Sequence, residues 1–118
     1  ASRSRAVSAD RIERFRALLD ARCRSRPPVA SYAEAMGITT GQLSRVCRAA
    51  FGLSAIQVID ARSIHEAKRL LGYSTMSVKQ VALELGFQDE AYFSRFFRKN
   101  TGLRPTEYRA EAGKARSG

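Results

Sequence analysis

Residues 86–109, GFQDEAYFSRFFRKNTGLRPTEYR, place a row of cations beside a cluster of aromatic side chains. Phe93, Phe96 and Phe97 have the i, i+3, i+4 spacing of one helix face. Arg95 and Arg98 fall on the opposite side. Guanidinium groups on an exposed helix face bind phosphate oxygens and, in a major groove, the O6 and N7 acceptors of guanine. The stretch therefore predicts a helix with an aromatic core face and an outer face suited to nucleic acid.

A similar pattern occurs earlier in the chain. GITTGQLSRVCRAAFGL and GFQDEAYFSRFFRKNTGL share the first glycine, a Ser-Arg pair, an arginine three residues further on and a closing Gly-Leu. The second copy has one extra residue in its turn. The corresponding residues are Ser44 and Ser94, Arg45 and Arg95, and Arg48 and Arg98. Matched inward and outward positions predict two copies of one structural unit.

Each copy has the pattern of a short helix, a tight turn and a second helix. In the first copy an apolar stripe ends at Gly37, a residue that tolerates the positive φ of a turn, and Thr39 with Gln42 forms a capping box. Gly86 and the capping residue Asp89 hold similar places in the second copy. This is the arrangement of a DNA-binding helix-turn-helix. We predict an all-α fold of two homeodomain-like helix-turn-helix subdomains joined by a long linker helix, with about seven helices.

The linker helix is predicted over about residues 55–71, capped by Ser54 with Gln57 and stopped by Gly72. At 1.5 Å per residue it spans roughly 25 Å, which with its flanking turns holds two recognition helices near the ~34 Å pitch of one DNA turn. The first helix is predicted from about Ala9, with Ser8 as its cap. The expected organisation is a flexible basic segment at 1–7, the first subdomain at 8–53, the linker helix at 54–72, the second subdomain at 73–109 and a flexible tail at 110–118.

Charge sets the class of partner. The chain has 118 residues, with 21 Lys+Arg against 11 Asp+Glu and a formal net charge of +10, which favours a polyanion. An anionic membrane is the competing partner, but no run of about 18 apolar residues and no signal peptide appears, so we expect a soluble cytoplasmic protein. Cys23 and Cys47 lack the close pairing of a zinc or redox motif, and we interpret both as reduced core residues.

The segment SVKQVALELGFQDEAYFSRFFRKNTGLRPTEYR resembles the signature of the AraC/XylS family of bacterial transcription regulators, and the resemblance covers residues 8–109. ARSIHEAKRLL resembles the linker helix of that family, and GLSAIQVI more loosely resembles members that respond to aromatic acids. The resemblance implies two recognition helices in successive major-groove segments of double-stranded DNA, most often for activation. It also implies an upstream effector or dimerisation domain, which this chain lacks, so we expect either a domain of a longer regulator or a small stand-alone member.

The DNA-contacting residues are assigned from the two repeated helices. Arg45 and Arg95 are the leading candidates for bidentate guanine contacts. Gln42 is ambiguous because its amide also serves the capping box, Glu90 also favours a helix N-terminus, and Tyr92 also suits the edge of the core. The base-reading candidates are Thr40, Gln42, Ser44, Arg45, Glu90, Ala91, Tyr92, Ser94 and Arg95. The phosphate-binding candidates are Arg48, Arg98 and Lys99.

Other functions have less support. Nucleophile, phosphate-loop and metal-ligand motifs are absent from the sequence, so we predict no enzyme, no cofactor and no metal site. A non-specific nucleic-acid-binding domain driven by charge remains an alternative, although RNA recognition usually uses exposed aromatic platforms. In another alternative, one helix-turn-helix binds DNA while the other contacts RNA polymerase or another protein.

Overall fold

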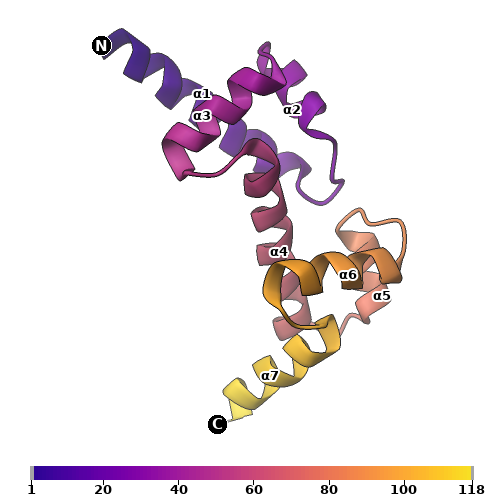
Figure 1. Ribbon diagram of the computed structural model, residues 1–118. Coiled ribbons are helices and arrows are strands. Elements are labelled where there is room, and N and C mark those ends of the chain that lie inside the picture. The colour runs from indigo at the N-terminus through magenta and orange to yellow at the C-terminus, as the bar shows by residue number, and fades with distance from the viewer. Residues whose placement is uncertain (1, 118) are drawn as a thin grey trace. The chain divides into compact units, whose positions relative to one another are not determined.

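The computed structural model describes residues 2–117, with side chains over residues 5–116, as seven α-helices without a strand (Figure 1). The helices are α1 (Ser2–Arg22), α2 (Val29–Met36), α3 (Thr40–Phe51), α4 (Ala55–Tyr73), α5 (Val78–Glu84), α6 (Glu90–Thr101) and α7 (Pro105–Ser117). The predicted all-α fold is thereby confirmed. None of the described helices is long and apolar enough to cross a membrane.

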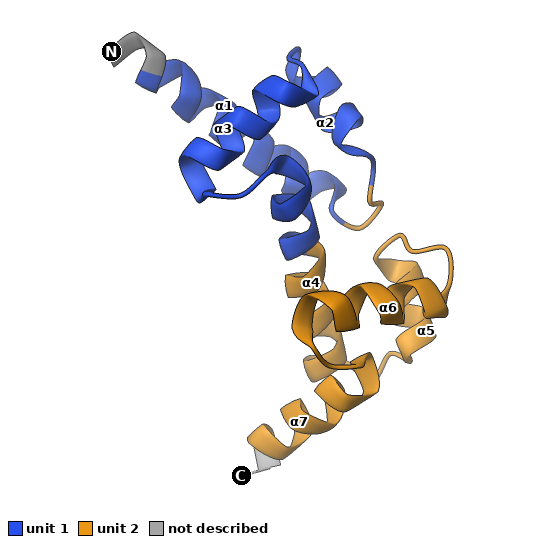
Figure 2. Cartoon of the chain, viewed as in Figure 1, with its two compact units in different colours: residues 1–23, 27–62 blue, residues 24–26, 63–118 orange. Residues whose placement is uncertain are grey.

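The chain forms two compact units, coloured separately in Figure 2. Unit 1 contains residues 1–23 and 27–62, and unit 2 contains residues 24–26 and 63–118. Helix α4 contributes to both, because Ala55 and Ile59 belong to the core of unit 1 whereas Ala67 and Leu71 belong to the core of unit 2. The linker predicted at 54–72 is thus also a core helix at each of its ends.

Unit 1 packs α1, α2, α3 and the start of α4 around one apolar cluster. Phe15 and Tyr32 are fully buried and meet edge to face, with ring centroids 5.6 Å apart. Leu43 and Cys47 of α3 belong to the same cluster and hold α3 against it. The Arg14 guanidinium donates to the carbonyl oxygens of residues 35 and 36, so it satisfies acceptors that the end of α2 leaves open.

Unit 2 is built around aromatic rings. Phe93 and Phe97 of α6 are fully buried, and their contacts continue to Phe87 and to Tyr108 of α7 at centroid distances between 5.1 and 5.9 Å. Phe96, which we expected to face the core with them, is only partly buried. Its ring is covered by the Arg26 guanidinium, which lies 4.6 Å from the ring centroid.

Residues 24–26 follow α1 in the chain and fold as part of unit 2, and we call them the strap. Arg24 donates to Glu84 of α5 at 2.6 Å and to Glu66 of α4 at 3.3 Å. The hydrogen bond to Glu84 raises the pKa of Arg24, and attraction from Glu66 and Glu84 adds to the effect. Arg26 donates to the buried Ser63 hydroxyl and lies over the Phe87 and Phe96 rings. The strap thereby joins α4, α5 and the turn before α6.

Three predictions about helix ends were wrong. Ser8 does not cap α1, because the helix begins at Ser2 and Ser8 lies inside it. Gly72 does not stop α4, which continues to Tyr73. Gly72 instead packs against α7, where an added Cβ would lie 3.6 Å from the Cβ of Ala112. Residues 110–117, predicted to be a flexible tail, continue α7 as helix.

Helical spacing in the sequence predicts that Ala50 and Ile56 lie on inward-facing apolar stripes, but both residues are exposed. Ile56 has 47% of its surface exposed, since Ala55 and Ile59 occupy the core-facing positions one helical turn apart. Ala50, expected in the stripe of α3, is also exposed, while Leu43, Val46 and Cys47 from the same stripe are buried. The buried faces of α3 and α4 are therefore narrower than the apolar pattern predicted.

Candidate nucleic-acid interface

Helix α3 is the second helix of the first helix-turn-helix. Its start is fixed by the capping box, in which Thr39 accepts from the Gln42 backbone N–H at 3.0 Å and the Gln42 side chain accepts from the Thr39 N–H at 2.9 Å. Leu43 and Cys47 anchor the inner face. The predicted site residues therefore lie on the outer face, with Thr40, Arg45 and Arg48 exposed and Gln42 and Ser44 partly buried.

Helix α6 is the second helix of the second helix-turn-helix. Asp89 caps it by accepting from the Tyr92 N–H at 2.7 Å, as predicted. Phe93 and Phe97 hold the inner face in the core. The outer face carries the remaining predicted residues, of which Ser94 is partly buried and the others are exposed: Glu90, Ala91, Tyr92, Arg95, Arg98 and Lys99.

The capping box limits what Gln42 offers to a ligand. Its Oε1 accepts from the Thr39 N–H, so this amide does not present the paired acceptor and donor that a bidentate adenine contact needs. Tyr92 is half exposed, and its ring lies 5.7 Å from that of Phe87. It therefore lies at the edge of the core with its outer side open to a ligand.

The cations on these two helices differ from most other arginines of the chain. Arg14, Arg24, Arg62 and Arg109 are engaged in hydrogen bonds within the protein. In the described part of the chain, no hydrogen bond or ion pair is formed by the side chains of Arg45, Arg48, Arg95, Arg98 and Lys99. These charges are free to neutralise an external anion, and they occur at matching positions of two equivalent helices.

Comparison with known proteins agrees with this geometry. A family profile described as "Helix-turn-helix domain" matches residues 32–111, which include the second helix-turn-helix pair and all of the first except the start of α2. The arabinose operon regulatory protein of Escherichia coli (strain K12) is 37% identical over 82 residues, which cover 70% of this chain. The chain belongs to the AraC family of helix-turn-helix DNA-binding domains. This AraC-family chain spans 28% of the length of that relative.

Other AraC-family proteins extend the comparison. The uncharacterised HTH-type transcriptional regulator YijO of E. coli K12 is 35% identical over 111 residues, covering 94% of this chain and 38% of the relative. The DNA-binding domain of AdpA, a global transcriptional factor crystallised with a target DNA, has a TM-score of 0.78 at 25% identity and covers 87% of this chain and 93% of that chain. An AraC-type regulator from Chromobacterium violaceum has a TM-score of 0.78 at 23% identity, over 91% of this chain and 96% of that chain, and shows the same fold.

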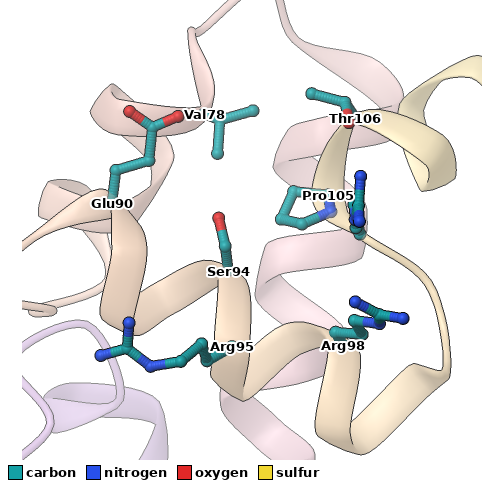
Figure 3. Close-up of a pocket in the computed structure, with 8 residues that line it drawn as sticks. Val78, Glu90, Ser94, Arg95, Arg98, Pro105 and Thr106 are labelled. Carbon is teal, nitrogen blue, oxygen red and sulfur yellow. The ribbon is translucent and has the colours of Figure 1, made fainter.

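The structure of this AraC-family chain also brings together residues that sequence reasoning did not assign. Arg104 and Thr106, at the start of α7, line a pocket with Ser94, Arg95 and Arg98 of α6 (Figure 3). One sequence signal was available, because Arg104 occupies the residue before Pro105 where a Ser or Thr cap is commoner. The proximity of α7 to the outer face of α6 depends on tertiary packing, which no local pattern encodes.

Proposed function

We propose that this domain binds double-stranded DNA sequence-specifically as part of a transcription regulator, with α3 and α6 each entering a major groove. The observation that carries the proposal is the set of exposed, unpaired cations at matching positions of α3 and α6. AraC-family membership supports it, and so does the crystal structure of the similar AdpA domain with its target DNA.

The proposed roles follow from exposure and chemistry. Arg45 and Arg95 project from the outer face in the middle of their helices, and each guanidinium can read guanine O6 and N7, which is worth roughly 1–3 kcal/mol of discrimination. Ser44, Ser94, Thr40 and Tyr92 supply hydroxyl groups at the same surface. The remaining base-reading candidates are Gln42, Glu90 and Ala91, of which Gln42 would use its free amide donors. Arg48, Arg98 and Lys99 are assigned to phosphates.

The test is selection of the preferred duplex from a random pool, followed by binding of Arg45→Ala and Arg95→Ala to that duplex and to variants of it. Two reading helices predict two short motifs, with each substitution relaxing preference at one motif and costing about 1–3 kcal/mol. Lys114→Ala is the charge-matched control, since Lys114 is highly exposed on α7, outside the two helix-turn-helix pairs, and forms an ion pair with Glu111 at 3.9 Å. Uniform binding to all sequences by the wild-type domain would contradict the proposal.

A second candidate gives unit 1 a protein contact, for example with RNA polymerase. It is favoured by Leu53 and Ile56, two exposed apolar side chains that follow α3 and have 37% and 47% of their surface exposed. The equivalent residues of unit 2 are Leu103, which is partly buried, and the polar Thr106. If unit 1 contacts protein instead of DNA, Arg95→Ala abolishes sequence preference and Arg45→Ala leaves it intact.

The regulatory context is also a proposal. Known relatives are about three times longer than the segment that matches them, since that segment is 28% to 38% of their length. This supports an attached effector or dimerisation domain in the complete regulator and a cytoplasmic location at its DNA. Relatives described as transcriptional activators, such as RhaR of Salmonella typhi, support activation as the outcome. A reporter gene placed behind the selected duplex tests this, because repression would lower its transcription.

A further inference from the structure

We propose that the pocket between α6 and the start of α7 is a binding site for one phosphate of the DNA backbone, with Arg98, Arg104 and Thr106 as its ligands. This inference rests on the proposed function and adds to it a contact made by α7, outside both helix-turn-helix pairs. We call it the α6–α7 pocket.

The α6–α7 pocket has a volume of about 250 Å³. Val78 and the buried Pro105 supply its apolar walls, and Ser94 and Thr106 supply hydroxyl groups. Figure 3 shows Arg98, Pro105 and Thr106 on one side of the pocket, with Ser94 between them and Glu90. A tetrahedral anion with oxygen atoms on several sides suits such a mixture of guanidinium and hydroxyl donors.

The charges around the pocket favour an anion. Three side chains with a guanidinium group, Arg95, Arg98 and Arg104, line the pocket together with one carboxylate side chain, Glu90. None of these four side chains has a hydrogen-bond or ion-pair partner within the described residues. In Figure 3, Glu90 lies beside Val78, whereas Arg98 and Thr106 lie on the other side of the pocket and Arg95 extends away from Pro105. Arg95 thus stays available for the groove while Arg98 turns to the phosphate.

Arg104 is placed where helix stability alone would not put it. It immediately precedes the first residue of α7, Pro105, and a cation at a helix N-terminus opposes the helix dipole. Its side chain caps nothing, while its backbone N–H donates to Glu107 at 2.8 Å. The equivalent residue of unit 1 is Ser54, whose hydroxyl caps α4 by accepting from the Gln57 N–H. The local cost at Arg104 is consistent with a role in binding an anion.

The second residue of the helix also differs between the two units, and again only unit 2 has a group that can bind an anion. Unit 2 has Thr106, whereas unit 1 has Ile56, so unit 1 lacks both the third guanidinium and the hydroxyl at this place. Unit 1 therefore serves as an internal comparison. It has the recognition-helix arginines Arg45 and Arg48, but it has no counterpart of the Arg104 guanidinium and the Thr106 hydroxyl.

The experiment compares Arg104→Ser with Lys114→Ser in the full chain, because each removes one positive charge, the first just before α7 and the second near its end. Arg104→Ser introduces the capping residue type of unit 1, so we expect a melting temperature at or above that of the wild type. Against the selected duplex, loss of one phosphate contact should lower the slope of log K against log salt by about 0.9 and weaken binding roughly 8-fold at 0.1 M salt. The loss should be equal on random DNA, because a phosphate carries no sequence information. Lys114→Ser should leave slope and affinity unchanged.

Methylphosphonate substitution then locates the phosphate. One backbone position should exist at which neutralisation weakens wild-type binding about as much as Arg104→Ser does, and weakens the Arg104→Ser variant no further. Equal slopes for Arg104→Ser and wild type on a duplex that the wild type binds specifically would overturn the phosphate site and leave the proposed function standing. A wild-type domain that binds no duplex specifically would overturn both. A third outcome is that inorganic phosphate stabilises the wild type, but not Arg104→Ser, against unfolding, while the two bind DNA equally well. That outcome would show a site for free anions and refute the DNA contact.

Discussion

Substituting Gly86 by alanine tests whether the strap is part of unit 2. Gly86 follows α5 with φ +83°, a conformation that L side chains rarely adopt. A Cβ at this position would lie 2.8 Å from the Arg24 carbonyl oxygen and 2.8 Å from the Ser25 carbonyl carbon. Both are backbone atoms of the strap, so relief requires the strap itself to move. Movement would disturb the Arg24 ion pairs with Glu66 and Glu84.

Gly102 provides the matched control for Gly86. It also has φ +83°, it also ends a helix of unit 2, and no atom lies within 4 Å of the position its Cβ would take. Gly102→Ala should therefore show the backbone strain alone, about 1–2 kcal/mol before a partial offset of roughly 0.4–1 kcal/mol from the stiffer unfolded chain. Gly86→Ala adds the steric conflict with the strap, which we place at about 1–3 kcal/mol further.

Urea denaturation followed by circular dichroism measures the free energy of unfolding of each variant. Amide hydrogen exchange then shows where protection is lost, and for Gly86→Ala we expect the loss in α5 and at the strap. Equal losses of stability in Gly86→Ala and Gly102→Ala would refute the reasoning, because the only difference assigned to the pair is the approach of residues 24 and 25. The same result would show that the strap does not rest on the turn after α5 in solution.

Three other substitutions test the interior and the helix caps. Thr39→Ala should cost about 1 kcal/mol of stability through loss of the capping box, whereas Thr40→Ala, at the exposed neighbouring position, should cost little in the same urea titration. Phe97→Ala should cost about 3–5 kcal/mol because the ring is fully buried, and Phe96→Ala, at a partly exposed ring, should cost less in thermal unfolding. Burial raises the pKa of the Cys47 thiol, so the folded state keeps this proton while the unfolded thiol ionises, and stability should fall as pH rises above the ordinary thiol pKa. The free energy of unfolding, measured at several alkaline pH values, should fall less steeply with pH for Cys47→Ala than for the wild type. An unchanged slope would show that Cys47 is not the cause.

The helix-turn-helix pairs were predictable because their signals are local. The sequence predicts capping boxes at Thr39 with Gln42 and, by the same spacing, at Ser77 with Gln80, and both are complete in the structure. Asp89 also caps its helix, by accepting from the Tyr92 N–H. Each signal involves residues three positions apart, so a single helical turn contains all the information needed. The order of the helices follows from these signals and their spacing.

The departures from prediction involve contacts between residues far apart in sequence. Gly72 resembles a helix stop, but it lies inside α4 and packs next to α7, where an added Cβ would meet the Cβ of Ala112 at an ordinary contact distance of 3.6 Å. No local sequence pattern assigns partners to Arg24 and Arg26, yet they bind Glu66, Glu84 and Ser63, which follow them by 37 to 60 residues. Such pairings depend on how helices pack, and the hydrophobic period of one helix does not specify them.

In the candidate site, too, the features encoded by local sequence were predictable and those set by helix packing were not. Exposure of Arg45 and Arg95 could be inferred from helical periodicity, since both lie opposite buried stripes of their own helices. The involvement of Arg104 could not, because its approach to Arg98 depends on where α7 lies on α6. Gln42 shows a further limit, since its type suited base reading but its amide oxygen is engaged with the Thr39 N–H.

The net charge of +10 overstates the charge that a DNA duplex would meet. Arg14 serves the end of α2, Arg24 and Arg69 surround Glu66, and Arg62 pairs with Asp20. Such side chains already have partners, so binding DNA would require them to exchange one hydrogen-bond or ion-pair partner for another with little gain. The unpaired cations of α3, of α6 and of the start of α7 carry no such cost. The salt dependence of DNA binding should therefore follow the number of these unpaired side chains that reach phosphates, and removal of a paired arginine should affect stability before it affects that slope.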